Sequence, residues 1–262
     1  MKRHIKLLGF LLTFVLLFAI SQLASATLFH TLVGWSVAIS EGLVFMLSYI
    51  VAMLLVVLLL RPIERLFNIS KSEVLIGRRG FNPVLILRGV ITLAAISVVL
   101  IPLSYIIPND ERTLPDSGWV LLTVGFIAPI FEEYIFRGRL YNMLGAMLQP
   151  SQAAVISSLI FGLVHLQPLV VIEGFVVGIL LSYFYIKCRS IVAPIILHSL
   201  YNIVAYALIT LSYQERELSA LIDDNIAYLI VYIIASIIFI ISFIRIFTKF
   251  HAENHRQQLI TK

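Results

Sequence analysis

Long runs of apolar residues, separated by short polar segments, dominate the pattern along the chain. A helix that crosses the hydrocarbon core of a bilayer needs about 20 mostly apolar residues. Such runs predict eight spans: Ile5 to Phe29, Gly42 to Leu60, Pro83 to Ile107, Gly118 to Phe136, Ser151 to Leu166, Leu169 to Ile186, Ile191 to Leu211 and Asn225 to Phe247. The fifth and sixth runs are short, so seven or nine spans are the alternatives. The pattern predicts an all-α, polytopic transmembrane helix bundle.

Composition supports a membrane protein. The chain has 262 residues, of which 60% are hydrophobic and 13% charged, whereas soluble domains have about 45–50% apolar and about 25% charged residues. We therefore expect residues 1–262 to form a single integral membrane domain in contact with the lipid bilayer. The lone cysteine, Cys188, rules out an internal disulfide and a four-cysteine zinc site.

The distribution of cations predicts the orientation of the bundle. Lys and Arg concentrate in short cytoplasmic loops of membrane proteins. They occupy alternate connections here: Lys2, Arg3 and Lys6; Arg61, Arg65, Lys71, Arg78 and Arg79; Arg137 and Arg139; Lys187 and Arg189; Arg245, Lys249, Arg256 and Lys262. The other connections contain only Arg112 and Arg216. Both termini are predicted to be cytoplasmic, and the net charge of +5 is explained without binding to nucleic acid. Arg88 lies close enough to the same surface to snorkel.

The N-terminus allows a second interpretation. Lys2-Arg3, an apolar run and Ala24-Ser25-Ala26 resemble a cleaved signal peptide. The apolar stretch resumes after Ala26. Cleavage would also remove the first cation-rich segment of the alternating pattern that predicts the orientation. We therefore expect span one to be retained, with cleavage as the alternative.

Two adjacent glutamates lie near the end of span four. Ionisable side chains at membrane depth are costly and face the bundle interior, where they are candidates for function. Glu133 and Arg137 are four residues apart and are expected to pair on one helix face, which a purely structural ion pair would also explain. Glu132 points about 100° away and has no cation three or four residues further on. It must therefore find a partner on another helix, take up a proton or hold a water.

Two histidines and an asparagine complete the polar set. His165 ends span five, and His198 and Asn202 share one face of span seven. Each alone is explained by packing. Together with Glu132 they suggest hydrolysis: a carboxylate and an imidazole deprotonate a water, while a second imidazole and an amide donate hydrogen bonds to the oxyanion. The residues therefore favour attack by water on a carbonyl.

Metal coordination is the alternative mechanism. Two histidines and one glutamate match many hydrolytic zinc sites, although no His-Glu-x-x-His helix is present.

The depth of the three residues in the bilayer poses a separate problem. At about 1.5 Å rise per residue, Glu132 and His198 lie roughly 10 Å from the cytoplasmic helix ends and His165 about 20 Å. The three meet only if span five tilts or begins outside the hydrocarbon.

Small residues suggest how spans five and six pack. Gly174, Gly178 and Ser182 recur every four residues in span six, which is the spacing that brings helix backbones close together. In span five, Ser158 and Gly162 share the face that carries His165. We expect both faces to make close helix contacts.

These residues carry a family resemblance. Glu132-Glu133-x-x-x-Arg137, Phe161-x-x-x-His165 and His198-x-x-x-Asn202 resemble, in order, the three motifs of the CPBP family, which includes type II CAAX prenyl endopeptidases and bacteriocin-processing or immunity (Abi) proteins. The likeness covers a CPBP-like catalytic core over residues 118–205. It implies an all-helical intramembrane endopeptidase.

The resemblance also implies a role for each motif residue. Glu132 and His165 would activate water, and His198 and Asn202 would hold the oxyanion. Glu133 and Arg137 would orient the site. No metal or cofactor would be required, with zinc as the alternative.

The expected substrate is a membrane-associated or lipidated peptide or protein, in a bacterial plasma membrane or alternatively the endoplasmic reticulum. A non-enzymatic immunity or regulatory protein of the same family is the main alternative function. A proton-coupled transporter that uses Glu132 is a further one, although the sequence has no internal repeat. The sequence does not indicate the oligomeric state.

Overall fold

The computed structural model describes residues 2–35, 39–69, 74–76, 82–107, 117–212 and 225–260. Every regular element within these ranges is helical. Six helical stretches are long and apolar enough to cross a membrane, and Pro150–Leu163 and Val192–Leu208 are shorter apolar helices. The predicted all-α, polytopic transmembrane bundle is confirmed, while the cytoplasmic location of both termini stays a prediction.

The helices begin close to the predicted positions. The elements are α1 (Lys2–Trp35), α2 (Glu41–Leu66), α3 (Pro83–Ser104), a continuous stretch from Gly118 to Gly145, α7 (Pro150–Leu163), α8 (Pro168–Cys188), α9 (Val192–Ser212) and α10 (Asn225–Ile260). Prolines at the first turns of α3, α7 and α8 explain these starts, because proline fits a helix N-terminus. Helices α1, α2 and α10 extend beyond their predicted ends, since hydropathy marks only the lipid-facing part of a helix. Lys71, Arg78, Arg79, Arg112, Arg216 and Lys262 lie outside the described residues.

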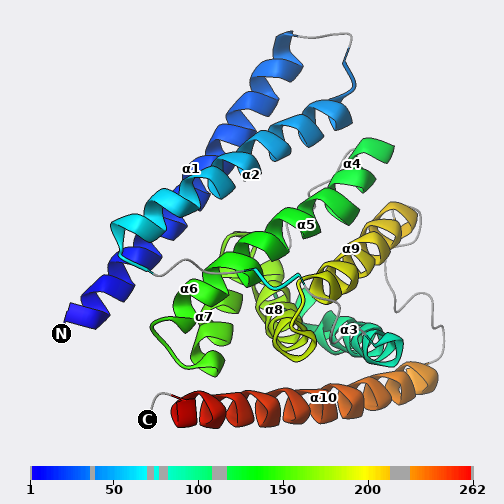
Figure 1. The fold of residues 1–262 in the computed structure, drawn as a ribbon. Coiled ribbons are helices and arrows are strands. Elements are labelled where there is room, and N and C mark those ends of the chain that lie inside the picture. Colours follow the sequence, from blue (N-terminus) through cyan, green and yellow to red (C-terminus); the bar gives the residue numbers. More distant parts are fainter. Residues whose placement is uncertain are drawn as a thin grey trace.

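The helices surround the stretch from Gly118 to Gly145. Helices α1 and α2 form a long hairpin on one side of the bundle (Figure 1). Helices α7, α8 and α9 pack on the other side, and α3 contacts α8 and α9. Helix α10 runs along the lower edge of the view and contacts α3, α7 and α8. The central stretch therefore has protein neighbours on several sides.

Aromatic packing joins the N-terminal hairpin to this central stretch. The Phe136 ring lies 6.0 Å from the Phe14 ring, 5.6 Å from the Phe18 ring and 5.1 Å from the Phe161 ring, measured between centroids. All four side chains are buried. Edge-to-face and tilted pairs at these separations are favourable, so α1, the central stretch and α7 share one apolar core.

Two π-helical segments interrupt the α-helical central stretch. It runs as α4 (Gly118–Leu122), a π-helical segment η1 (Thr123–Ile127), α5 (Ala128–Glu133), a second π-helical segment η2 (Tyr134–Tyr141) and α6 (Asn142–Gly145). A π-helical turn pairs residues five apart and often marks a functional site. Neighbouring helices bond to its carbonyls: the Asn202 amide donates to Val124 at 2.8 Å and the Ser157 hydroxyl to Phe136 at 3.0 Å. These side chains therefore hold the turns that flank α5.

Helices α7 and α8 meet through the small-residue faces for which the sequence predicted close helix contacts. A Cβ added to Gly174 would lie 3.1 Å from the Cα of Gly162, and one added to Gly178 would lie 2.9 Å from the Cβ of Ser158. The Ser158 and Ser182 hydroxyls are 3.3 Å apart. Close backbone approach and a buried hydroxyl contact thus fix α8 against α7.

This packing predicts that Gly162→Ala destabilises the protein. Its Cβ would overlap the backbone carbonyl of Val171, which cannot move away as a flexible side chain could. Overpacking of this kind typically costs about 1–3 kcal/mol, so the midpoint of thermal unfolding in detergent should fall.

Gly118→Ala is the matched control, because a Cβ there would have nothing within 4 Å. Equal midpoints for the two variants would show that the contact between α7 and α8 is looser than described.

Candidate active site

A fully buried ion pair lies at the centre of the polar cluster. Arg137 Nη1 donates to Glu133 Oε1 at 2.8 Å, and both side chains have no exposed surface. The predicted pairing of these residues along one helix face is therefore present. Taking two charges out of water costs several kcal/mol for each ion, so such a pair requires good geometry and additional hydrogen bonds.

Arg137 finds additional partners on two other helices. Its Nη2 donates to the carbonyl of Gly178 on α8 at 3.2 Å. Its guanidinium carbon lies 4.4 Å from the centroid of the Phe161 ring, close enough for a cation–π interaction. Arg137 thus links η2 to both α7 and α8.

His198 bridges the two glutamates. Its Nδ1 lies 2.8 Å from Glu133 Oε1, and its Nε2 lies 3.7 Å from Glu132 Oε2. An ionised carboxylate can only accept a hydrogen bond, so Nδ1 carries a proton and donates it to Glu133. The ring is thereby oriented with Nε2 toward Glu132. A carboxylate orients the catalytic histidine of serine proteases in the same way.

Glu132 has the cross-helix partner that its sequence context requires. The hydroxyl of Tyr49, on α2, donates to Glu132 Oε1 at 2.8 Å. Sequence reasoning missed Tyr49, which is one of eleven tyrosines and lies 83 residues from Glu132. The available signal was its position within an apolar span, because a buried tyrosine hydroxyl usually finds a hydrogen-bond partner.

His165 lies in the turn after α7, two residues beyond Leu163, rather than within the helix. Its Nδ1 lies 2.8 Å from the carbonyl oxygen of Phe161. A carbonyl only accepts, so Nδ1 is the donor, and the neutral ring leaves Nε2 as the proton acceptor. This tautomer suits a general base.

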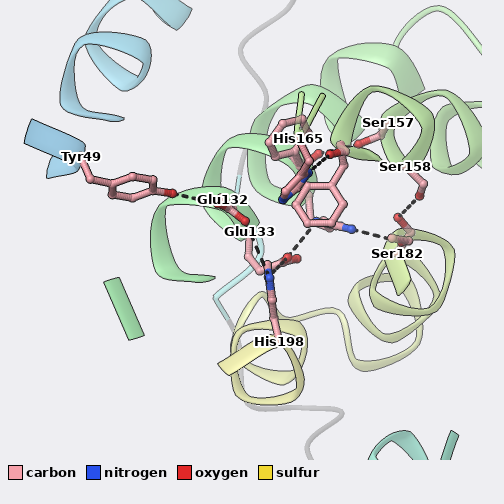
Figure 2. A network of polar contacts seen from close by, with 12 residues as sticks. Tyr49, Glu132, Glu133, Ser157, Ser158, His165, Ser182 and His198 are labelled. Atoms are coloured by element: carbon pink, nitrogen blue, oxygen red, sulfur yellow. Dashed lines mark hydrogen bonds and ion pairs between the residues drawn. The ribbon is translucent and has the colours of Figure 1, made fainter. Parts of the chain in front are cut away.

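The aromatic ring of Phe161 separates the two histidines. Its centroid lies 5.1 Å from that of His165 and 5.6 Å from that of His198, with the rings near perpendicular. Figure 2 shows Glu132, Glu133, His165 and His198 gathered in one network from three parts of the fold. Helix α7 has 14 residues and rises about 21 Å, so His165 lies about as far from the start of the helix as the sequence predicted.

Asn202 lies one helical turn beyond His198 on α9, and its amide donates to the Val124 carbonyl in η1. A side-chain amide has two N–H groups. The hydrogen bond to Val124 uses one of them and anchors α9 to the central stretch, and no described residue accepts from the other.

Zinc coordination remains the alternative mechanism. In the part of the chain that the structure describes, no three His, Cys, Asp or Glu side chains are grouped to hold a metal ion. The Nδ1 atoms of His165 and His198 are engaged by Phe161 and Glu133, which leaves Nε2 of each ring as the nitrogen that could bind a metal.

This arrangement can perform acid–base chemistry. It combines a carboxylate held by a tyrosine, an imidazole with a free Nε2 and a second imidazole oriented by a buried carboxylate. Such groups transfer protons to and from a reacting water. Among the described residues, no hydrogen bond joins Glu132 directly to His165.

Comparison with known proteins finds a family likeness over the segment that carries this cluster. Residues 115–204 match the family model of the Rce1-like type II CAAX prenyl endopeptidases. The chain is 31% identical over 104 residues to the membrane-embedded CAAX protease MroQ of Staphylococcus aureus, covering 36% of this chain and 42% of that protein. No solved structure matches the chain.

Two other bacterial proteins are similar. An uncharacterized 24.3 kDa protein of Escherichia coli is 32% identical over 93 residues, covering 34% of this chain and 43% of that protein. The putative membrane peptidase YdiL of Bacillus subtilis is 27% identical over 172 residues, covering 62% of this chain and 70% of that protein. The chain thus spans about two fifths of the Escherichia coli and Staphylococcus aureus relatives. The resemblance predicted from the three motifs is confirmed: residues 115–204 of this membrane protein are similar to the Rce1-like type II CAAX prenyl endopeptidases.

Proposed function

We propose that this protein is an intramembrane endopeptidase that hydrolyses peptide bonds of a membrane-associated or lipidated peptide. The observation that carries the proposal is the convergence of Glu132, His165 and His198 from α5, from the turn after α7 and from α9. The similarity to Rce1-like endopeptidases supports the same reaction class.

In the proposed reaction, Glu132 and His165 act on one water. His165 Nε2 or the Glu132 carboxylate accepts a proton as the water oxygen bonds to the carbonyl carbon of the scissile peptide. The tetrahedral intermediate then collapses. The C–N bond breaks, and the same group returns the proton to the departing amine. The products are a carboxylic acid and an amine, which become a carboxylate and an ammonium group when the acid proton passes to the amine, and no other reactant is consumed.

His198 and Asn202 are proposed to bind the oxyanion of that intermediate. The Asn202 amide has a second N–H to donate, and His198 can donate from Nε2 when its ring carries both protons. The two neighbouring carboxylates stabilise that charged ring. Donors aimed at developing negative charge usually make a large contribution to acyl-transfer catalysis.

The proposed setting is the plasma membrane of a bacterium. The similar proteins from Escherichia coli, Staphylococcus aureus and Bacillus subtilis are all bacterial. The name of the Staphylococcus aureus relative, a membrane-embedded CAAX protease, supports a substrate at the membrane surface.

The proposal predicts that Glu132→Gln and His165→Ala each reduce peptide cleavage by purified protein at least about 100-fold, as removal of a general acid or base does. Cleavage of a peptide library, followed by mass spectrometry, measures the effect. Glu253→Gln is the control, because Glu253 pairs with Lys249 on α10, away from the cluster. Wild-type rates for both site variants would contradict the assignment.

Two additional measurements separate the alternatives. A chelator should leave cleavage unchanged, whereas loss of activity that zinc restores would overturn water activation by Glu132 and His165 alone. The same inactive variants can be tested in cells for protection against a bacteriocin. If the variants protect fully and the wild type shows no detectable peptide cleavage, a non-enzymatic immunity protein is favoured.

Tyr49→Phe should lower kcat about tenfold or more while KM stays nearly unchanged. A hydrogen bond to a charged group contributes about 1.5–3 kcal/mol, and this one holds Glu132, which acts on water rather than on substrate binding. Tyr228→Phe on α10 is the matched control. A raised KM at constant kcat would show instead that Tyr49 contacts the substrate.

A further inference from the structure

A cavity lined by cationic and apolar side chains lies between α3, α8 and α10. Its volume is about 610 Å³, and none of the residues of the candidate active site lines it. Four cations line this cavity: Arg88, Lys187, Arg245 and Lys249. They come from three different helices, so the fold brings together charges that are far apart in the sequence.

Few negative groups balance these cations. Lys249 pairs with Glu253 at 2.5 Å, and Lys187 donates to the Tyr183 hydroxyl at 2.8 Å. Within the described ranges, neither Arg88 nor Arg245 forms an ion pair with a carboxylate. The cavity therefore carries an excess of positive charge that an anion would balance.

Apolar and hydroxyl groups form the deeper walls. Leu180, Phe184 and Ile246 are buried apolar lining residues. The hydroxyls of Thr92 and Ser242, also in the lining, are 3.0 Å apart and connect α3 to α10. Arg88, Lys187 and Arg245 are exposed. The charges thus lie at the surface and the apolar side chains below them.

The neighbouring surface of α10 is suited to an acyl chain. Ile241 and Ile244 flank the lining residues Ser242 and Arg245, and they are 44% and 61% exposed. An apolar helix face beside a cluster of cations fits a lipid better than a free phosphate, which would use only the cations.

The positions of the cavity's cations along their helices agree with a site at the membrane surface. Arg88 lies in the second turn of α3, and Lys187 in the last turn of α8. The distribution of cations predicts that both of these ends face the cytoplasm. Basic cavities between membrane helices on this side bind anionic headgroups.

We propose that this cavity binds the phosphate headgroup of an anionic phospholipid from the cytoplasmic leaflet, with an acyl chain along Ile241 and Ile244. The site is separate from the candidate active site and does not depend on the proposed proteolysis.

The test compares lipid retention by full-length variants in detergent. Purified protein is titrated with phosphatidylglycerol, and native mass spectrometry measures the bound fraction. Arg88→Gln combined with Arg245→Gln should weaken binding about tenfold or more, because each cation attracts an anionic headgroup. Arg61→Gln combined with Arg65→Gln is the control. It makes the same change of charge at the end of α2, outside the cavity, and should bind as the wild type does.

Each outcome supports or overturns the proposal. Equal weakening by both double variants would indicate a nonspecific effect of charge and overturn the site. Equal binding of zwitterionic phosphatidylcholine, which has a phosphate but no net charge, would overturn recognition of an anionic phospholipid. Binding of soluble glycerol 3-phosphate as tight as that of phosphatidylglycerol would overturn the lipid assignment in favour of a site for free phosphates. Preference for phosphatidylglycerol that only the cavity variant loses would support the proposal.

Discussion

The buried pair of Glu133 and Arg137 constrains the rest of the site. Both side chains are withdrawn from solvent, so each charge must be compensated by protein groups. Glu133 accepts from His198 on α9, and Arg137 donates to Gly178 on α8. One ion pair therefore fixes the central stretch relative to α8 and α9. A large shift of either helix would break a hydrogen bond to one member of the pair.

The packing around the ion pair keeps its hydrogen-bond partners within reach. Gly178 is small enough for the guanidinium of Arg137 to reach its carbonyl, whereas an added Cβ would lie 3.2 Å from Nη2. The π-helical segments on either side of α5 are held by Asn202 and Ser157. Backbone geometry, small residues and cross-helix hydrogen bonds together position Glu132 and Glu133 for different partners.

The sequence predicted the elements and the polar set better than the contacts within that set. Apolar runs predicted where most helices begin, and four-residue spacing predicted the Glu133–Arg137 pair and the close packing of the small-residue faces of α7 and α8. Spacing along a helix does not determine which nitrogen of His198 meets which carboxylate. The contact with Glu133 therefore emerged only from the fold, as did the hydrogen bond from Tyr49. The π-helical turns were also beyond prediction, because neighbouring helices supply partners for their carbonyls.

The two glutamates have different surroundings. Glu132 is held by a tyrosine and lies 3.7 Å from Nε2 of His198, whereas Glu133 is enclosed by protein. In the proposed mechanism, adjacent positions on one helix would provide one carboxylate for chemistry and another for orientation. Their roughly 100° separation around the helix axis makes this division possible.

The most direct test of this account is the thermal stability of Glu133→Gln beside Glu253→Gln, measured by unfolding in detergent. Both changes remove one carboxylate from a pair spaced four residues apart, but only Glu133 is fully buried. Leaving Arg137 without its partner should cost about 3–5 kcal/mol, whereas a partly exposed pair contributes about 0–1 kcal/mol. A large drop in the unfolding midpoint for Glu133→Gln alone is the predicted result. Equal small drops would show that the buried pair does not hold the site together.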